Sequence, residues 1–343
     1  MSTQNKIINV GNWQSGNPNL VPIGKRIKRV VHDPDTLDLY YFKEPKEKYP
    51  WEFWTEIVSY QIGKVYGFNV LKYDIAISDD IVGCISPSIN LKNEELIHGQ
   101  QLLTQLLPTF ETKKGTDHSF QLIEKLFKKD ESLKPLLNDF ILMLVFDSVI
   151  GNRDRHQQNW AIVRGVSLEF KKFLLNAQIF NKDLTLNKLL WQFFKSIFSK
   201  EKMKKFGELE VDINEYYKFS PFFDNGNCLA YNIIEENIDH IIGSQSKLEN
   251  YLFGKKAVSH VKWQGEQITH LELLKKLTPN YKNEIIKGVE LINKVPFNQV
   301  EEIIKDIDKN IENIPSKYAL TLQRKELMCK LVNLRIKHLL ESF

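Results

Sequence analysis

Cysteine is scarce in this chain, and its placement excludes two kinds of small cross-linked domain. The three cysteines, Cys84, Cys228 and Cys329, lie far apart in the sequence and form no CxxC pair. This spacing supports neither a structural zinc site nor a disulfide framework, and it suits a reducing compartment. We therefore expect a cytoplasmic protein that is held together by a hydrophobic core.

Long apolar runs are missing as well. The longest, FILMLVF at 140–146, is far shorter than the roughly 18 residues that a membrane-spanning helix needs. The N-terminal stretch MSTQNKIINVGNW has no apolar segment of the kind found in signal peptides. The sequence therefore predicts no transmembrane segment.

A strong excess of one charge is the third absence. The 47 basic and 43 acidic side chains leave a net charge of +4, and no dense stripe of lysine and arginine is present. A general nucleic-acid binder would normally carry such a stripe, so there is no strong nucleic-acid signal. With 343 residues and 42% hydrophobic residues, the chain is long enough for two lobes, each with a buried core.

The first quarter of the chain is typical of a small β-rich part with one helix. The alternation around the turn HDPDT predicts a hairpin over 26–43. Apolar residues at helical spacing predict a helix over 51–66 that ends at Gly67. Two further strands are expected at 70–77 and 80–86, joined by a turn at SDD.

The remainder is typical of a larger, mainly helical part. Helices are expected at 94–107 and at 133–150, the second apolar nearly all round and therefore buried. A short strand follows at 160–163. The further expected elements are one or two amphipathic helices over about 169–210 and C-terminal helices over 283–343, which are broken at Pro296 and Pro315.

A short polar segment, GNRDRHQQN at 151–159, lies directly after the most buried helix. It contains Asp154 and Asn159, and a second acidic site, Asp224 in FFDNGN, follows a later strand. One amide and carboxylates on two loops form a set of hard oxygen ligands, which suits Mg²⁺. Asp154 would then orient a hydroxyl nucleophile while Asn159 and Asp224 hold the metal, as in protein kinases.

The N-terminal part contains residues for the phosphates of ATP. Lys43 closes a strand, and Glu56 lies in the next helix, the order that kinases use for a phosphate-binding lysine and its partner. The phosphate-covering loop is expected around Gly24 in VPIGKRIK, with GNWQSGNPN as the other candidate; neither has a GxGxxG pattern. Taken singly, Lys43 and Glu56 would be ordinary surface charges, so the hypothesis depends on their combination.

Together, GNRDRHQQNW and SPFFDNGNCL resemble the D-x-H-x-x-N loop and the metal loop of HipA-like serine/threonine kinases, a branch of the protein-kinase-like superfamily. YYFKEP resembles the strand of that family that ends in Lys-Pro. TEIVSYQIGKVYGFNV resembles its first helix, and the C-terminal helices agree as well. The resemblance extends from about Gly24 to the C-terminus.

The resemblance implies an α+β, two-lobed protein-kinase-like fold, with a small β-rich N-lobe at 1–88 and a larger, mainly helical C-lobe at 89–343. ATP would lie between the lobes, with its adenine beside the connector at Cys84 to Ser88, which includes Ser86. The implied activity is transfer of the γ-phosphoryl group to a Ser or Thr hydroxyl, with Mg²⁺. His156 is expected to support its loop rather than to react.

The segment between Asn159 and Asp224 is far longer than the hairpin expected in the family, so residues of about 167–210 are interpreted as an insertion. The resemblance also implies a protein substrate and an antitoxin or other regulatory protein as partner. Two alternatives remain open. One is a phosphatidylinositol-type lipid kinase, whose loops share the D-R-H-x-x-N pattern, and the other is a catalytically silent nucleotide-binding module.

Overall fold

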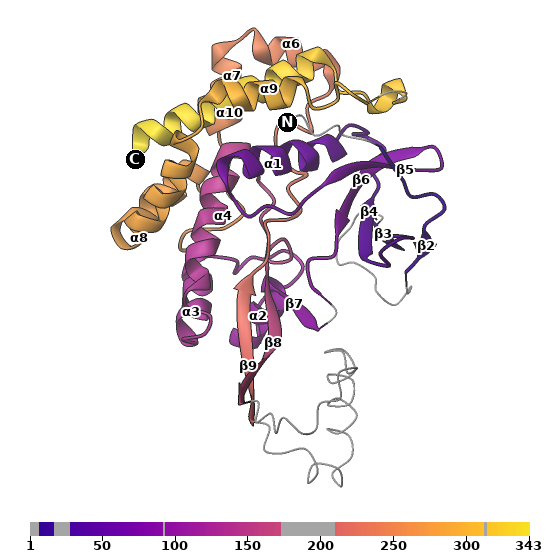
Figure 1. Ribbon diagram of the computed structural model, residues 1–343. Coiled ribbons are helices and arrows are strands. Elements are labelled where there is room, and N and C mark those ends of the chain that lie inside the picture. The colour runs from indigo at the N-terminus through magenta and orange to yellow at the C-terminus, as the bar shows by residue number, and fades with distance from the viewer. Residues whose placement is uncertain (1–6, 17–27, 92, 173–209, 312–313) are drawn as a thin grey trace. The chain divides into compact units, whose positions relative to one another are not determined.

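The computed structural model describes residues 7–16, 28–91, 93–172, 210–311 and 314–343. The chain divides into two compact units, one formed by Met1–Val163 with Tyr217–Phe343 and the other by Arg164–Tyr216. The described elements combine an N-terminal sheet with a mainly helical C-terminal part (Figure 1). Among the described residues, no helix combines the length and apolar character required to cross a membrane.

The N-terminal sheet has six strands in the order β1-β5-β6-β4-β3-β2. The predicted hairpin is present as β3 (Lys28–His32) and β4 (Leu39–Lys43), which pair in antiparallel register. The other strands are β1 (Ile8–Asn9), β2 (Gln14–Ser15), β5 (Asp74–Ser78) and β6 (Ile81–Pro87). Because β6 pairs with β4, Cys84 lies directly opposite Lys43 at the end of that strand.

Helix α1 (Phe53–Tyr66) follows this hairpin and packs against β5 and β6. It ends where predicted, because Gly67 adopts the left-handed conformation at φ 81° and its N–H caps the last turn. The helix is buried over most of its surface, and this includes Glu56, which is fully buried. A buried carboxylate requires a partner, so we expect Glu56 to form an ion pair beneath the sheet.

The helical part is organised around α4 (Leu136–Ile150), as its apolar sequence predicted. Helix α4 packs along α8 (His270–Asn293) and α10 (Leu322–Ser342). The other α-helices of the described residues are α2 (Gly99–Leu106), α3 (Phe120–Lys129), α6 (Glu235–Ile242), α7 (Gln245–Phe253) and α9 (Phe297–Lys305). Helix α8 begins earlier than predicted, at His270, where Thr269 and Glu272 form a capping box.

Two expectations for the middle of the chain were wrong. Residues 94–98 form a strand, β7 (Glu94–His98), and only the part from Gly99 is helical, because β7 joins a three-stranded sheet in the order β7-β8-β9. Strand β8 (Ala161–Lys172) continues into the segment expected to be helical, and β9 (Glu210–Phe219) leads back. Most of the predicted insertion, 173–209, lies outside the described residues. Pairing between strands overrides local helix propensity here.

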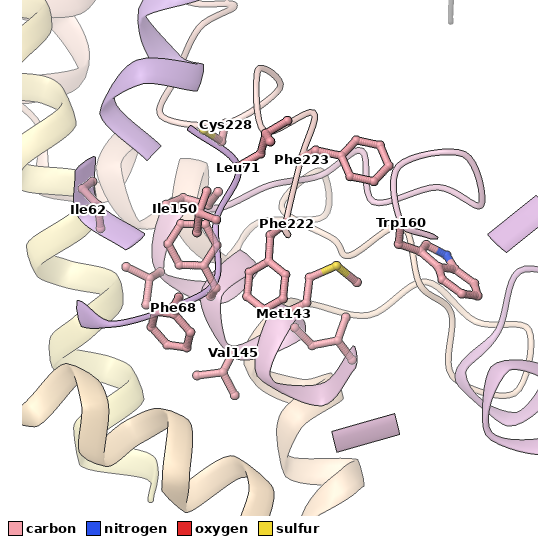
Figure 2. Close-up of a cluster of buried hydrophobic side chains, with 14 of the residues drawn as sticks. Ile62, Phe68, Leu71, Met143, Val145, Ile150, Trp160, Phe222, Phe223 and Cys228 are labelled. Atoms are coloured by element: carbon pink, nitrogen blue, oxygen red, sulfur yellow. The ribbon is translucent and has the colours of Figure 1, made fainter. Parts of the chain in front are cut away.

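The main hydrophobic core joins the N-terminal helix to the helical part. Phe68 and Phe222 pack against Phe146 of α4, with ring centroids 5.3 Å and 6.0 Å from it. Figure 2 shows Phe68 and Phe222 within this cluster of buried side chains. Phe222 and Phe223 directly precede Asp224, and both are buried in this core. Asp224 is thus attached directly to residues of the packed core.

Candidate active site

Lys43 is held between two carboxylates that come from different parts of the chain. It is 4% exposed at the end of β4, and its Nζ bonds Glu56 of α1 and lies 2.5 Å from Oδ1 of Asp224. The pairing of Lys43 with Glu56 is the one the sequence predicted, whereas the contact with Asp224 joins residues far apart in the sequence. An ammonium placed between two carboxylates can position phosphate oxygens next to a metal-binding carboxylate.

The second oxygen of Glu56 also has a defined role. Oε2 accepts a hydrogen bond of 2.7 Å from the backbone N–H of Asn225. Glu56 therefore orients Lys43 with one oxygen and the loop at 220–229, here called the Asp224 loop, with the other. The Tyr73 hydroxyl accepts the N–H of Asp224 at 3.3 Å. Burial, with added repulsion from Glu56 and Asp224, raises the pKa of Tyr73 well above its ordinary value, so the hydroxyl stays protonated.

Asp224 adopts a backbone conformation that few residues accept. Its φ is 55°, in the left-handed region where Asn, Asp and Gly are enriched. The Asp224 side chain is 20% exposed, compared with 6% for the side chain of Lys43 taken without its backbone. Lys28 of β3 approaches Oδ2 of Asp224 at 3.9 Å. The carboxylate thus remains accessible to solvent on one side while it contacts lysines on the other.

Asp154 lies on the loop at 151–159, here called the Asp154 loop, which begins where α4 ends at Gly151 with φ 69°. The Asn152 side chain accepts the N–H of Asp154 at 3.0 Å. The side-chain amide of Asn159 donates to the Asp154 carbonyl at 2.7 Å. This bond fixes the orientation of the Asn159 side-chain oxygen. These local hydrogen bonds give the loop a defined shape before any ligand binds.

Arg155 joins the two loops, and the sequence reasoning missed it. Its guanidinium is buried and forms an ion pair of 2.7 Å with Asp147 of α4. Nη1 donates to the carbonyls of Asn159 and Phe223, both at 2.7 Å, and Nη2 donates to Asn225 at 2.7 Å. One side chain therefore holds the backbone of Asn159 close to that of Phe223, the residue before Asp224.

A second link between the loops was also missed. The Asn227 side-chain amide donates to Oδ2 of Asp154, and its oxygen lies 3.4 Å from Nζ of Lys46. Lys46 further approaches Glu52 at 3.2 Å and lies 5.0 Å from the Tyr231 ring centroid. The signal was present in the sequence as the last residue of DNGN and the second lysine of KEPK, but neither has a regular spacing that marks it.

The other predicted site residues are placed as follows. Cys84 and Ser86 are buried in β6, whereas Gly24 lies outside the described residues. His156 accepts the N–H of Gln158 on Nδ1 at 3.2 Å, and its Nε2 is 3.9 Å from Asp154. The described residues contain no group of three or more His, Cys, Asp or Glu that could enclose a metal by themselves. The prediction that Asn159 and Asp224 hold Mg²⁺ would therefore require water and phosphate as the other ligands.

By sequence, the chain matches no family model and no curated protein. By structure, it is similar to the proinflammatory kinase CtkA of Helicobacter pylori, with a TM-score of 0.68 at 16% identity over 98% of this chain and 96% of that one. It is also similar to HipA of Shewanella oneidensis MR-1, solved with HipB and operator DNA, with a TM-score of 0.50 at 11% identity. That match covers 94% of this chain and 66% of the HipA chain.

These likenesses define the fold class. The chain has a two-lobed, protein-kinase-like α+β fold, with a curled N-terminal sheet and a helical C-terminal part. More particularly, the fold is that of HipA-like kinases, so the resemblance predicted from the D-R-H-x-x-N and D-N-G segments is confirmed at the level of fold. The division of the lobes at residue 88 stays a prediction.

Proposed function

We propose that this protein is an ATP-dependent protein kinase that transfers the γ-phosphoryl group to a Ser or Thr hydroxyl. The observation that carries the proposal is the position of Lys43 between Glu56 and Asp224, with Asp154 joined to the same loop through Arg155 and Asn227. A buried lysine between two carboxylates is costly to build for stability alone. It is the arrangement that phosphoryl transfer uses.

The residues divide the work between substrate and nucleotide. Lys43, oriented by Glu56, would hold the phosphates. Asp154 would orient the acceptor hydroxyl and take its proton, and its one-third exposed side chain leaves room for that hydroxyl. Asn159 and Asp224 would hold Mg²⁺, which neutralises charge on the phosphates when bound. Most of the rate enhancement would then come from positioning and charge stabilisation.

The fold supports a phosphotransferase, and the structural neighbours suggest its context. CtkA is described as a kinase, and HipA as part of a toxin–antitoxin system with HipB. We therefore expect a protein substrate and, in analogy with HipA, an antitoxin or another regulatory protein as partner. ATP and Mg²⁺ are the expected cosubstrate and metal.

The test is incubation of the purified protein with γ-labelled ATP and Mg²⁺, followed by mass spectrometry of the protein and of a cell lysate. Labelled Ser or Thr is expected in the wild type, while Asp154→Ala and Asp224→Ala should each reduce labelling by 10²-fold or more, by analogy with loss of other transition-state contacts. Asp224→Ala should also weaken Mg·ATP binding, because it removes a metal ligand, whereas Asp154→Ala should leave binding nearly unchanged.

The alternatives give different outcomes in the same assay. Label that appears in phosphatidylinositol vesicles, and in no protein, would identify a lipid kinase. Tight ATP binding without any turnover, in the wild type and in both variants, would identify a regulatory nucleotide-binding module. Full activity of either variant would refute the assignment of the site.

A further inference from the structure

Arg335 differs from the other deeply buried arginines of the described chain. Arg155 and Arg324 form ion pairs with Asp147 and Glu235, at 2.7 Å and 2.6 Å. Arg335, on α10, is only 8% exposed, yet it pairs with no carboxylate of the described residues. Among the described residues, its guanidinium donates one long hydrogen bond, of 3.5 Å, to the carbonyl of Ile150. A buried guanidinium with five donors normally has an anionic partner.

The charged side chain that acts on this guanidinium is a second cation, Arg153, rather than a carboxylate. Burial, with a smaller contribution from the charge of Arg153, lowers the pKa of Arg335 to about 10, and Tyr251 and Cys228 oppose this shift. His270 is neutral at pH 7, because burial lowers its pKa to about 4. The Ile150 carbonyl at the C-terminus of α4 offers only the partial negative charge of a helix end.

Arg335 lines a small pocket of about 30 Å³ at the start of α8. That volume is two to three times what one water molecule needs, so it accommodates an ion of a few atoms but not a nucleotide. Thr269 is the N-cap of α8, and the N–H groups of His270 and Leu271 lie in the first turn, where no intrahelical partner exists. The lining residues are Ser148, Leu252, Phe253, Thr269, His270, Leu271, Arg335, His338 and Leu339.

We propose that Arg335 and the first turn of α8 form a binding site for a small inorganic oxyanion of the phosphate class. A guanidinium matches two oxygens of such an ion in a bidentate arrangement. The helix N-terminus contributes N–H donors and a positive dipole end. Three carboxylates lie near the site. Glu272 is engaged by the N–H and hydroxyl of Thr269, and Glu341 lies 3.8 Å from His338. Asp147, which acts on His270, is paired with Arg155.

The proposed site lies directly behind the Asp154 loop. The guanidinium packs against Gly151, where an added Cβ would come within 2.2 Å of Nη2 of Arg335. His270 Nε2 donates to the carbonyl of Asn152 at 2.6 Å. A bound anion would therefore stabilise the residues from which the Asp154 loop begins, whether or not the loop is catalytic.

The test is a thermal unfolding titration of the full chain with inorganic phosphate, at constant ionic strength against potassium chloride. The wild type and Arg335→Gln both keep the candidate active site intact, so phosphate bound there would contribute equally to both titrations. We expect Tm to rise by several degrees with saturation, and we expect Arg335→Gln to lose that rise. Arg164→Gln, which removes an exposed arginine, is the matched charge control and should keep the full response.

An equal response in Arg335→Gln, or no response beyond that of chloride, would overturn the proposal and leave Arg335 as a cap of α4. Because Arg335→Gln can fail to fold, a second measurement uses the chain with its arginine intact. Crystals grown with selenate should show anomalous selenium density within hydrogen-bond distance of Arg335. Density only at other sites would equally reject the proposal. Neither readout depends on kinase activity, so this result and that of the labelling assay are independent.

Discussion

At the scale of single residues, the structure explains why Lys43 and Glu56 must act together. Glu56 is fully buried and holds Lys43 with one oxygen and the Asn225 N–H with the other. A carboxylate in that position is stable only while both partners are present. Its pairing with Lys43 thus orients the lysine and also fixes the loop that presents Asp224.

The first prediction concerns this pair. Lys43→Met should raise KM for ATP and lower kcat together, reducing kcat/KM by about 10²-fold or more, because the lysine contacts phosphates in both ground and transition states. Glu56→Gln should have the same effect more mildly, since glutamine can still accept the Asn225 N–H. Steady-state kinetics with a labelled substrate measure this, and thermal unfolding of each variant checks the fold. An unchanged Lys43→Met enzyme would contradict the assignment.

The second prediction concerns Asn227 and Lys46, which we propose position Asp154 and do not themselves react. Asn227→Ala removes the amide that contacts the Asp154 carboxylate, so kcat should fall by about 10- to 100-fold with little change in KM for ATP. Lys46→Met should give a smaller loss in kcat in the same direction. Lys48→Met is a nearby control, because its Nζ lies over the Tyr49 ring on the protein surface. A pure KM effect in Asn227→Ala would show that Asn227 serves the nucleotide instead.

At the scale of elements, one side chain joins α4, the Asp154 loop and the Asp224 loop. Arg155 makes five hydrogen bonds to four residues, namely Asp147, Asn159, Phe223 and Asn225. Because it is almost fully buried, removing the side chain would leave these buried polar groups without their hydrogen-bond partner. The geometry of the candidate site thus depends on the contact that Arg155 makes between α4 and the two loops, more than on either loop alone.

The third prediction follows from that contact. Arg155→Met should lower the free energy of unfolding by about 3–5 kcal/mol, because it leaves the Asp147 carboxylate buried without its cation. Arg155→Lys keeps the charge but loses the planar fork, so it should recover only part of the stability. Urea unfolding measures both. Arg164→Gln, at an exposed ion pair, should cost about 1 kcal/mol or less. Comparable costs for the exposed and buried sites would contradict the proposed role.

At the scale of the whole molecule, buried histidines make stability depend on pH. Burial lowers the pKa of His98, His118, His260 and His270, the last to about 4. The folded pKa of His270 is therefore below the unfolded value of about 6.5, so between these values the unfolded chain binds more protons. Its contribution to stability is present above pH 6.5 and is lost as the pH falls toward 4.

The fourth prediction is a loss of folding free energy on acidification through this window. His270 alone should account for about 3 kcal/mol by pH 4, a figure that already includes the opposing effect of Asp147 and the supporting effects of Arg335 and Arg153 on its pKa. Urea unfolding at a series of pH values measures the slope, and His270→Gln, whose amide can still donate to the Asn152 carbonyl, should make the slope shallower. Identical slopes in the wild type and this variant would show that His270 titrates normally.

Much of the architecture could be predicted because it depends on local patterns. The hairpin that ends at Lys43, the cap at Gly67 and the buried helix α4 all follow from turn residues and hydrophobic periodicity. The strand β7 could not be found in this way, because its partner lies far along the chain and pairing decides its conformation.

The sequence alone determined which chemical groups are available: Lys43, Glu56, Asp154, Asn159 and Asp224, in the order of a HipA-like kinase. Only the tertiary structure decided how they are held. The contacts of Arg155, Asn227 and Arg335 join residues that are far apart in the chain or presented by irregular loops. Such contacts depend on packing and on the requirement that buried polar groups find partners. Neither requirement produces a regular spacing of residues that could be recognised in the sequence.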